Sequence, residues 1–393
     1  MHILEIPSFF IPHGGEFCLE QARALQQRGH QVRVLSCCEL AVTMDRAAYL
    51  TAPHGRRWET LDGVECYRTF MRAVPRAVRY NEQRWVRCVM SMYGDYVRRY
   101  GRPDVLHAHC IKWAGVAALE IARREGIPCY VTEHLSSVLF RKDFGADWSR
   151  CRWAQGLIRR TMESVTCVIP VSAELVADLH PFFGSNYRYH VISNIVDVEH
   201  FGLGLTPEQI VARRRAQRQE LRPHRLVCLA RAEVVDKGYD VLAQAVAGGW
   251  LRAHGVELHI AGRGTEGLRG LFPDGEVILH GNLDKAAVRD LLWQCDALVM
   301  PSRCESQCLV VLEALASGVP VVATEAVPSN ARIEGGCIIV PIGEAEPLRG
   351  AMERVLPLSL DAGCIEQLRR MVAPESVAAQ LEQLFTEGQS DAP

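Results

Sequence analysis

Short apolar runs alternate with amphipathic stretches along most of the chain. The first run, HILEIPSF (2–9), is followed by a helical pattern at 16–29 and by a second run, QVRVLSCC (31–38). The alternation continues through apolar runs at 104–109, 128–134, 165–172 and 189–194, with a helical pattern at 112–126. Short buried strands that take turns with helices are typical of a parallel sheet covered by helices on both faces.

The alternation stops at about 198–224 and then starts again. Residues 205–225 are polar, basic and flanked by proline, with no strand pattern. Beyond them, apolar runs lie at 225–232, 256–262, 276–281, 297–302, 320–324 and 336–341, and helical patterns at 238–252, 284–294, 308–317 and 375–385. We therefore predict an α/β fold with two doubly wound domains, residues 1–200 and 201–372, joined by a linker and followed by a closing helix within 373–393.

The composition is that of a globular protein. Of the 393 residues, 48% are hydrophobic and 23% charged, and the net charge of −2 gives no reason to expect nucleic acid as a partner. The 15 cysteines include no C-x-x-C pair, so we expect reduced, mostly buried thiols in a cytoplasmic protein. No apolar run approaches the roughly 20 residues that span a bilayer, and MHILEIPSFF predicts a buried strand rather than an export signal.

The stretch AGRGTEGLRG (261–270) has the glycine spacing of a dinucleotide-binding turn, with Gly262, Gly264 and Gly267. That fingerprint normally occupies the first βα turn of its domain and needs an acidic residue at the end of the next strand. Here it belongs to the second βα unit, and the next strand ends LHGN. An NAD-dependent oxidoreductase is therefore disfavoured, and the turn is kept as a candidate nucleotide contact.

Two glutamates stand out in PSRCESQCLVVLEALASGVPVVAT (301–324). We expect Glu305 in a loop after a strand and Glu313 two turns into a helix that begins near Gln307, so that both carboxylates face one crevice. The amides at the start of that helix would form an anion site, contributed by Ser306, Gln307, Cys308 and Leu309. The alternative is a helix cap at Glu305 and a solvated side chain at Glu313.

This E-x7-E pattern, followed by EALASGVPVVAT, resembles the retaining glycosyltransferases of family 4. The resemblance covers most of the chain and includes PHGGEF, DVLHAH, PVSAELVADL, VISNIVDVEHF and LARAEVVDKGYDVL. It implies the GT-B architecture: two Rossmann-like domains with an interdomain cleft, and a C-terminal helix that crosses back onto the N-terminal domain.

The resemblance also implies roles on the donor side. Arg231 and Lys237 match the positions that hold the donor diphosphate, Glu313 matches the ribose contact, and Glu305 matches the contact with the transferred sugar. Gly262 and Gly264 would then lie beside the nucleotide, and Asn282 and Leu283 near its base. Two cations and a helix start can neutralise a leaving diphosphate without a metal. We expect no metal and no cofactor, and the sequence contains no Asp-x-Asp pair.

The N-terminal half supplies the other expected contacts. Gly14 and Gly15 match a loop that lets the backbone approach the diphosphate and acceptor, and His109 matches a position that hydrogen-bonds the donor sugar. Glu133 and His134 are assigned to the acceptor side, with a core role as the alternative.

A zinc site at His107, His109 and Cys110 lacks further ligands at metal-like spacing, so we expect one core and one functional histidine. The chain departs from the family pattern at Pro328–Ser329, where glycines are usual, and Glu334 is the candidate acidic residue there.

Residues 68–102 form an arginine-rich segment in which Trp85, Met90, Met92 and Tyr93 are interleaved. Such a segment is either a solvated face or a basic helix that rests on an anionic membrane surface.

The sequence as a whole predicts a cytoplasmic, retaining, metal-independent glycosyltransferase. Its donor would be a UDP or GDP sugar and its acceptor a glycan or a lipid-linked saccharide of surface glycan assembly. A nucleotide-sugar epimerase of the same fold and a non-catalytic nucleotide-sugar-binding protein are the alternatives.

Overall fold

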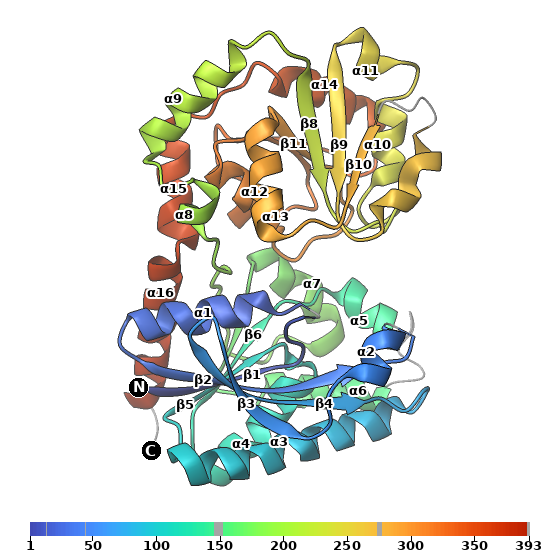
Figure 1. Ribbon diagram of the computed structural model, residues 1–393. Coiled ribbons are helices and arrows are strands. Elements are labelled where there is room, and N and C mark those ends of the chain that lie inside the picture. Colours follow the sequence, from blue (N-terminus) through green and yellow to red (C-terminus); the bar gives the residue numbers. More distant parts are fainter. Residues whose placement is uncertain (13, 44, 145–151, 273–276, 391–393) are drawn as a thin grey trace. The chain divides into compact units, whose positions relative to one another are not determined.

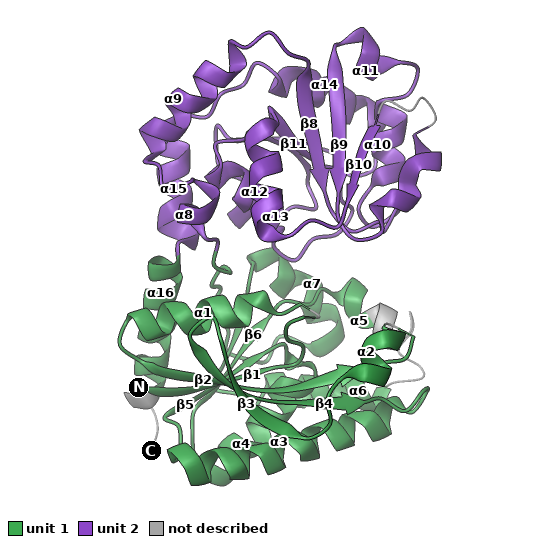
Figure 2. Ribbon diagram, viewed as in Figure 1, with its two compact units in different colours: residues 1–195, 374–393 green, residues 196–373 purple. Residues whose placement is uncertain are grey.

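Two separate parallel sheets organise the chain. The computed structural model describes residues 1–393 except 13, 44, 145–151, 273–276 and 391–393. The chain divides into unit 1, residues 1–195 and 374–393, and unit 2, residues 196–373 (Figures 1 and 2).

Unit 1 contains a seven-stranded sheet in the order β3-β4-β2-β1-β5-β6-β7. All neighbouring strands are parallel except the edge pair β3–β4. Without β3 the order is that of a doubly wound Rossmann sheet, which reverses between β1 and β5. The strands are β1 (His2–Pro7), β2 (Gln31–Leu40), β3 (Arg56–Leu61), β4 (Val64–Arg72), β5 (Val105–His109), β6 (Cys129–Glu133) and β7 (Cys167–Pro170).

Helices cover both faces of this sheet, as buried parallel strands require. The helix expected at 112–126 begins only at Val116, because Lys112 and Trp113 have non-helical backbone angles. The run at 189–194 forms an isolated bridge with Val168 instead of a strand. The helices before the crossover are α1 (Glu16–Gln27), α2 (Arg46–Thr51), α3 (Val78–Tyr100), α4 (Val116–Glu125), α5 (Ser137–Phe144), α6 (Arg152–Met162) and α7 (Ala173–Phe183).

Unit 2 repeats the same topology with six parallel strands in the order β10-β9-β8-β11-β12-β13. The order reverses between β8 and β11, and the central strands are buried in two apolar clusters. These strands are β8 (His224–Leu229), β9 (Val256–Ala261), β10 (Val277–Gly281), β11 (Ala297–Met300), β12 (Val321–Thr324) and β13 (Cys337–Val340). The main helices are α8 (Val198–Phe201), α9 (Pro207–Arg218), α10 (Tyr239–Ala245), α11 (Trp250–Ala253), α12 (Lys285–Gln294), α13 (Leu309–Ala316), α14 (Ala345–Val355) and α15 (Ala362–Val372).

The expected linker at 198–224 is wrong, because this segment folds as part of unit 2. Thr206 and Gln209 form a capping box that starts α9. Arg214 of α9 is buried and donates hydrogen bonds to the carbonyl oxygens of Leu292, Trp293, Cys295 and Ser317. Burial lowers the pKa of Arg214 to about 9. Its guanidinium binds the carboxyl ends of α12 and α13. The polar segment is therefore a helix that packs against the rest of unit 2.

The closing helix α16 (Pro374–Ser390) belongs to unit 1, although α15 before it belongs to unit 2. Val377, Leu381 and Phe385 are buried in the unit 1 core, and the Tyr130 hydroxyl donates to the carbonyl oxygen of Leu384 at 3.1 Å. The crossing helix implied by the family resemblance is therefore present.

Candidate functional site

Four neighbouring strands of unit 2 place most of the predicted donor-binding residues along one edge of the sheet. Arg231 follows β8, Gly262 follows β9, Asn282 follows β10 and Glu305 follows β11. The carboxyl ends of parallel strands, next to the point where strand order reverses, are where doubly wound sheets bind ligands. We call these residues, together with Lys237 and helix α13, the unit 2 edge.

Lys237 and Glu305 form an ion pair at this edge. The Lys237 Nζ donates to Oε1 of Glu305 at 2.7 Å, and the Ser302 hydroxyl donates to the same oxygen at 2.7 Å. The two ionic side chains are only 16% and 10% exposed. Burial alone would lower the pKa of Lys237, but the charge and hydrogen bond of Glu305 raise it above its usual value. Lys237 is therefore a fixed cation, and Glu305 orients it.

Arg231 is the more accessible cation. Its side chain is 57% exposed and lies 3.7 Å from Glu233, a weak surface pair that a phosphate can replace. Arg303, which the sequence interpretation missed, pairs with both oxygens of Asp240 at 2.7 Å and donates to the carbonyl oxygen of Val235. These contacts tie the loop after β8 to the loop after β11.

The helix after Glu305 begins later than expected. It starts at Leu309 rather than near Gln307, and Cys308 caps it with a left-handed backbone (φ 66°). Glu305 therefore lies four residues before the first residue of the helix, and helical turns do not align it with Glu313 as expected. Glu313 is half-buried on a helix whose other residues are mostly buried. The first amides of α13 still form the helix start to which an anion can bind.

Two of the predicted site glycines lie so close to neighbouring backbone that a side chain there would collide with it. A Cβ at Gly262 would lie 2.0 Å from the carbonyl oxygen of Ala230, and a Cβ at Gly15 would lie 2.4 Å from that of Phe9. Both residues have positive φ, as do Gly14 and Gly264. Close packing of neighbouring loops therefore accounts for Gly262 and Gly15. Asn282 is exposed and Leu283 packs against the unit 2 core.

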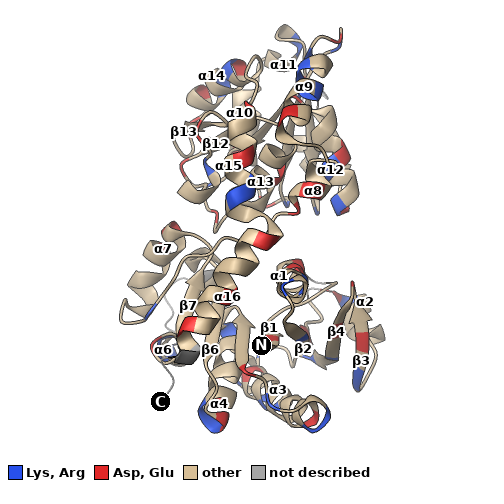
Figure 3. Cartoon of the chain, turned by 90° about the vertical axis from the view of Figure 1, so that its left-hand side faces the viewer, with Lys and Arg blue, Asp and Glu red and all other residues tan. Residues whose placement is uncertain are grey.

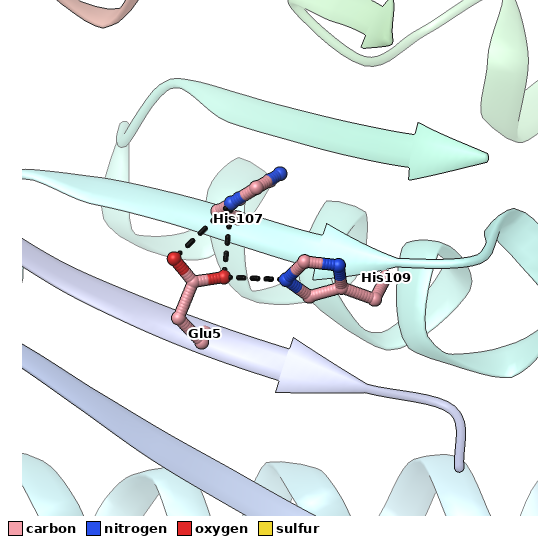
Figure 4. A group of neighbouring side chains, drawn as sticks. All are labelled: Glu5, His107 and His109. Carbon is pink, nitrogen blue, oxygen red and sulfur yellow. Dashed lines mark hydrogen bonds and ion pairs between the residues drawn. The ribbon is translucent and has the colours of Figure 1, made fainter. Parts of the chain in front are cut away.

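Unit 1 has a different group of side chains, a glutamate and histidines, beside the point where its strand order reverses. Glu5 of β1 accepts hydrogen bonds from two histidines of β5, His107 Nδ1 at 2.9 Å and His109 Nε2 at 2.8 Å (Figure 4). All three side chains are at most 1% exposed. Burial alone would raise the pKa of Glu5, but the two histidines hold it at about 2. We call Glu5, His107, His109 and His134 the unit 1 edge.

Both ring nitrogens of His109 have partners within the protein. Nε2 lies 2.8 Å from Glu5 Oε2, and Nδ1 lies 3.4 Å from His134 Nε2. The expected direct hydrogen bond from His109 to a donor sugar is therefore unavailable in this arrangement. His134 follows β6, and its ring stacks on Phe17 with centroids 3.8 Å apart. Its Nδ1 is buried and has no hydrogen-bond partner among the described residues. Of the two histidines, His134 is the one with a nitrogen available to a ligand.

Glu133 has a structural role. Its Oε1 accepts from the amides of His134 and Leu135, and its Oε2 accepts from the amide of Ile111, each at 2.8 Å. Burial raises the pKa of this carboxyl group to about 7, against the opposing effect of these amides. The carboxylate is committed to the backbone of two loops, which favours the core alternative over contact with an acceptor.

Three of the aromatic and methionine residues of the basic segment point into unit 1. Trp85, Met92 and Tyr93 of α3 are at most 5% exposed, and the Trp85 indole donates to the carbonyl oxygen of Cys37. Their assignment to a lipid surface is wrong. Basic residues recur along α3, where they are coloured blue in Figure 3. At Pro328–Ser329 the chain forms a short 3-10 turn, and Glu334 is exposed.

Two family descriptions match this sequence. "Glycosyltransferase Family 4" matches residues 14–200, and "Glycosyl transferases group 1" matches residues 223–357. The chain belongs to glycosyltransferase family 4.

Relatives of this glycosyltransferase agree with that assignment. It is 26% identical over 325 residues to the putative teichuronic acid biosynthesis glycosyltransferase TuaC of Bacillus subtilis, covering 81% of this chain and 78% of TuaC. It is 29% identical to a D-inositol 3-phosphate glycosyltransferase of Pseudarthrobacter chlorophenolicus, covering 58% of this chain and 57% of that protein.

Solved structures show that the glycosyltransferase has the GT-B fold. Sucrose-phosphate synthase from Thermosynechococcus elongatus superposes with a TM-score of 0.76 at 18% identity, covering all of both chains. Anabaena Alr3699/HepE in complex with UDP and glucose gives a TM-score of 0.67 at 15% identity, covering 98% of this chain and 100% of that one. Among the described residues, no helix is long and apolar enough to cross a membrane.

Proposed function

We propose that this glycosyltransferase moves a sugar from a UDP or GDP sugar to a saccharide or lipid-linked acceptor in surface glycan assembly, with retention of configuration and without a metal. The observation that carries the proposal is the unit 2 edge, where Arg231, Lys237 and the start of α13 gather positive charge at the carboxyl ends of parallel strands. TuaC carries the name of a teichuronic acid biosynthesis enzyme, and HepE binds UDP and UDP-glucose in its solved complexes. These names support the donor class and the pathway class.

In the proposed reaction, the acceptor hydroxyl oxygen bonds to the anomeric carbon while the bond from that carbon to the diphosphate breaks. The hydroxyl proton passes to the departing diphosphate, so atoms and charge balance without a covalent enzyme intermediate. Arg231 and Lys237 stabilise the negative charge of the leaving group. Glu313 holds the ribose. Glu305 engages Lys237 and Ser302 through Oε1, and we assign its Oε2 to a hydroxyl of the transferred sugar.

On the unit 1 edge, we assign the free nitrogen of His134 to a sugar hydroxyl. Gly14 and Gly15 keep the loop before α1 narrow enough for a substrate to approach its backbone. Unit 1 thus orients hydroxyl groups, and unit 2 binds the nucleotide.

A test begins with a thermal-shift panel of nucleotide sugars, followed by transfer assays with saccharide and lipid-linked acceptors. The expected product has the same anomeric configuration as the donor, measured by proton NMR, and turnover persists in excess EDTA. Full dependence on added Mg²⁺ or Mn²⁺ contradicts the metal-independent mechanism. Epimerised donor formed without an acceptor identifies an epimerase, and donor binding without transfer identifies a binding protein. NADH serves as the negative control.

For the lipid-linked acceptor, a membrane-facing surface is proposed around α2 and the start of α3. Leu50, Val74, Val78 and Tyr80 are 40–65% exposed, and Arg72 joins α2 to the end of β4 through the carbonyl oxygens of Tyr49 and Ala52. We expect binding to anionic but not neutral vesicles, weakening as salt rises. In a vesicle sedimentation assay, the double variant Val78→Ser, Tyr80→Ser should lose binding. The control Leu221→Ser should keep it. If the double variant and the control bind equally well, this surface is excluded.

A further inference from the structure

The unit 1 edge contains a chain of hydrogen bonds that has only one possible direction. Glu5 lies in the middle of the sheet on β1, His109 ends the neighbouring strand β5, and His134 follows β6. Successive separations are 2.8 Å from Glu5 Oε2 to His109 Nε2 and 3.4 Å from His109 Nδ1 to His134 Nε2. Figure 4 shows Nε2 of His109 directed at the carboxylate of Glu5.

The direction follows from the chemistry of the groups. An ionised carboxylate can only accept hydrogen bonds, so the Nε2 of His109 carries the proton. A neutral imidazole has one N–H, so Nδ1 of His109 is an acceptor and the Nε2 of His134 must donate to it. By the same rule, Nδ1 of neutral His134 carries a lone pair. Burial lowers the pKa of both histidines, that of His134 well below its usual value, which keeps both rings neutral near pH 7.

Neighbouring groups hold the first member of this chain in place. His107 donates through Nδ1 to Glu5, and the Thr132 hydroxyl donates to Nε2 of His107 at 2.7 Å. Glu5, His107 and His109 could also be considered as metal ligands. However, tetrahedral zinc ligands lie about 3.3 Å apart, because zinc–ligand bonds are about 2.0–2.1 Å. Separations of 2.8 and 2.9 Å are those of ordinary hydrogen bonds instead.

The hydrogen-bond chain ends at His134, at an atom that lacks a partner among the described residues. The Nδ1 of His134 is buried without a partner in the described part of the protein, and the ring is held face to face against Phe17. A buried acceptor without a donor costs free energy, which a ligand hydroxyl can recover. His134 also lies at the edge where doubly wound sheets bind ligands.

We propose that Glu5 and His109 are positioning residues that fix the tautomer of His134, so that its Nδ1 accepts a hydrogen bond from a substrate hydroxyl. This inference rests on the proposed function for the identity of that hydroxyl, a sugar hydroxyl. Glu5 and His109 act only through His134 and do not touch substrate.

The tautomers can be measured directly with histidine-selective nitrogen-15 labelling and NMR of the ligand-free protein. In the wild type, His109 and His134 should both be neutral with the proton on Nε2. In Glu5→Gln, the amide can donate as well as accept, so both rings should become tautomer mixtures. Glu65→Gln, the same change at a carboxylate that pairs with Arg33 outside this network, is the matched control and should leave His134 unchanged.

Kinetics supply a second readout. Glu5→Gln should lower kcat by about tenfold to a hundredfold, the scale seen when an orienting partner is lost. Its dissociation constant for the nucleoside diphosphate should stay at the wild-type value, because unit 2 carries that contact. Glu65→Gln should keep wild-type kcat.

A proton on Nδ1 of His134 in the wild type overturns the inference, as does an unchanged His134 spectrum in Glu5→Gln. Stoichiometric zinc in the purified protein also overturns it. If Glu5→Gln does not fold, the wild-type spectrum alone still decides. The NMR measurement needs no substrate, so failure of the proposed function shows as absent transfer with the tautomers as predicted.

Discussion

The two sheet edges have the same topology and opposite chemistry. In each unit the strand order reverses beside the first strand, and residues at the carboxyl ends of parallel strands form the candidate site. At the unit 1 edge, Glu5, His107 and His109 are fully buried and joined by hydrogen bonds. At the unit 2 edge, Arg231 is exposed and Lys237 is a charged group held by Glu305.

This difference shows how one fold can serve two tasks. A buried network of two neutral histidines anchored on an ionised carboxylate fixes the direction in which hydrogen bonds are offered and suits uncharged hydroxyl groups. Partly exposed cations suit a diphosphate, because they attract charge without the cost of burying an unpaired ion. The fold provides the position of each site, and the residues at the strand ends decide what it binds.

Loss of positive charge at the unit 2 edge should produce the largest effect on turnover. Arg231→Ala and Lys237→Ala should each lower kcat/KM by about 2–4 kcal/mol of transition-state stabilisation, roughly thirtyfold to a thousandfold. Initial rates with saturating acceptor measure this loss. Lys285→Ala, which removes an exposed cation paired with Asp197 at 3.8 Å, is the control and should retain wild-type rates.

Lys237→Ala also leaves the carboxylate of Glu305 nearly buried without its cation, so its folded fraction must be measured by thermal unfolding. Arg231→Ala avoids this complication because Arg231 is exposed. Rates of Arg231→Ala equal to those of the control would show that the diphosphate is held elsewhere.

The strand pattern predicted the fold well because buried parallel strands are continuous apolar runs. The hairpin β3–β4 was missed, although Asp62–Gly63 between two strand-forming runs is a strong signal for a two-residue turn. The polar composition of residues 205–225 favours a linker, which the structure replaces with helix α9. Arg214 is buried through hydrogen bonds to carbonyl groups that are distant in sequence, and composition cannot reveal such partners.

The candidate sites show the same limit. Lys237 and Glu305 could be selected from family motifs, yet their direct contact joins residues 68 positions apart. In the sequence, Glu5 is one polar residue inside a first buried strand, and no motif marks it. Only the register of β1 against β5, 102 residues later, brings it to His107. At Gly262 the neighbouring backbone alone demands glycine, so the glycine pattern there does not by itself indicate a nucleotide contact.

A smaller effect should separate the two glutamates of the unit 2 edge. Glu313, assigned to the ribose, makes a contact that is the same before and during transfer. Glu313→Gln should therefore raise the donor KM by about tenfold, the scale of a hydrogen bond to a charged group, with kcat nearly unchanged.

Glu305, assigned to the transferred sugar, lies where positive charge develops. Glu305→Gln should lower kcat by about tenfold and leave UDP or GDP affinity intact, because the side-chain amide of the variant still offers Lys237 an oxygen. Steady-state kinetics and calorimetric titration with the nucleoside diphosphate distinguish the two variants, and identical changes in KM and kcat would show that both glutamates contact the same part of the donor.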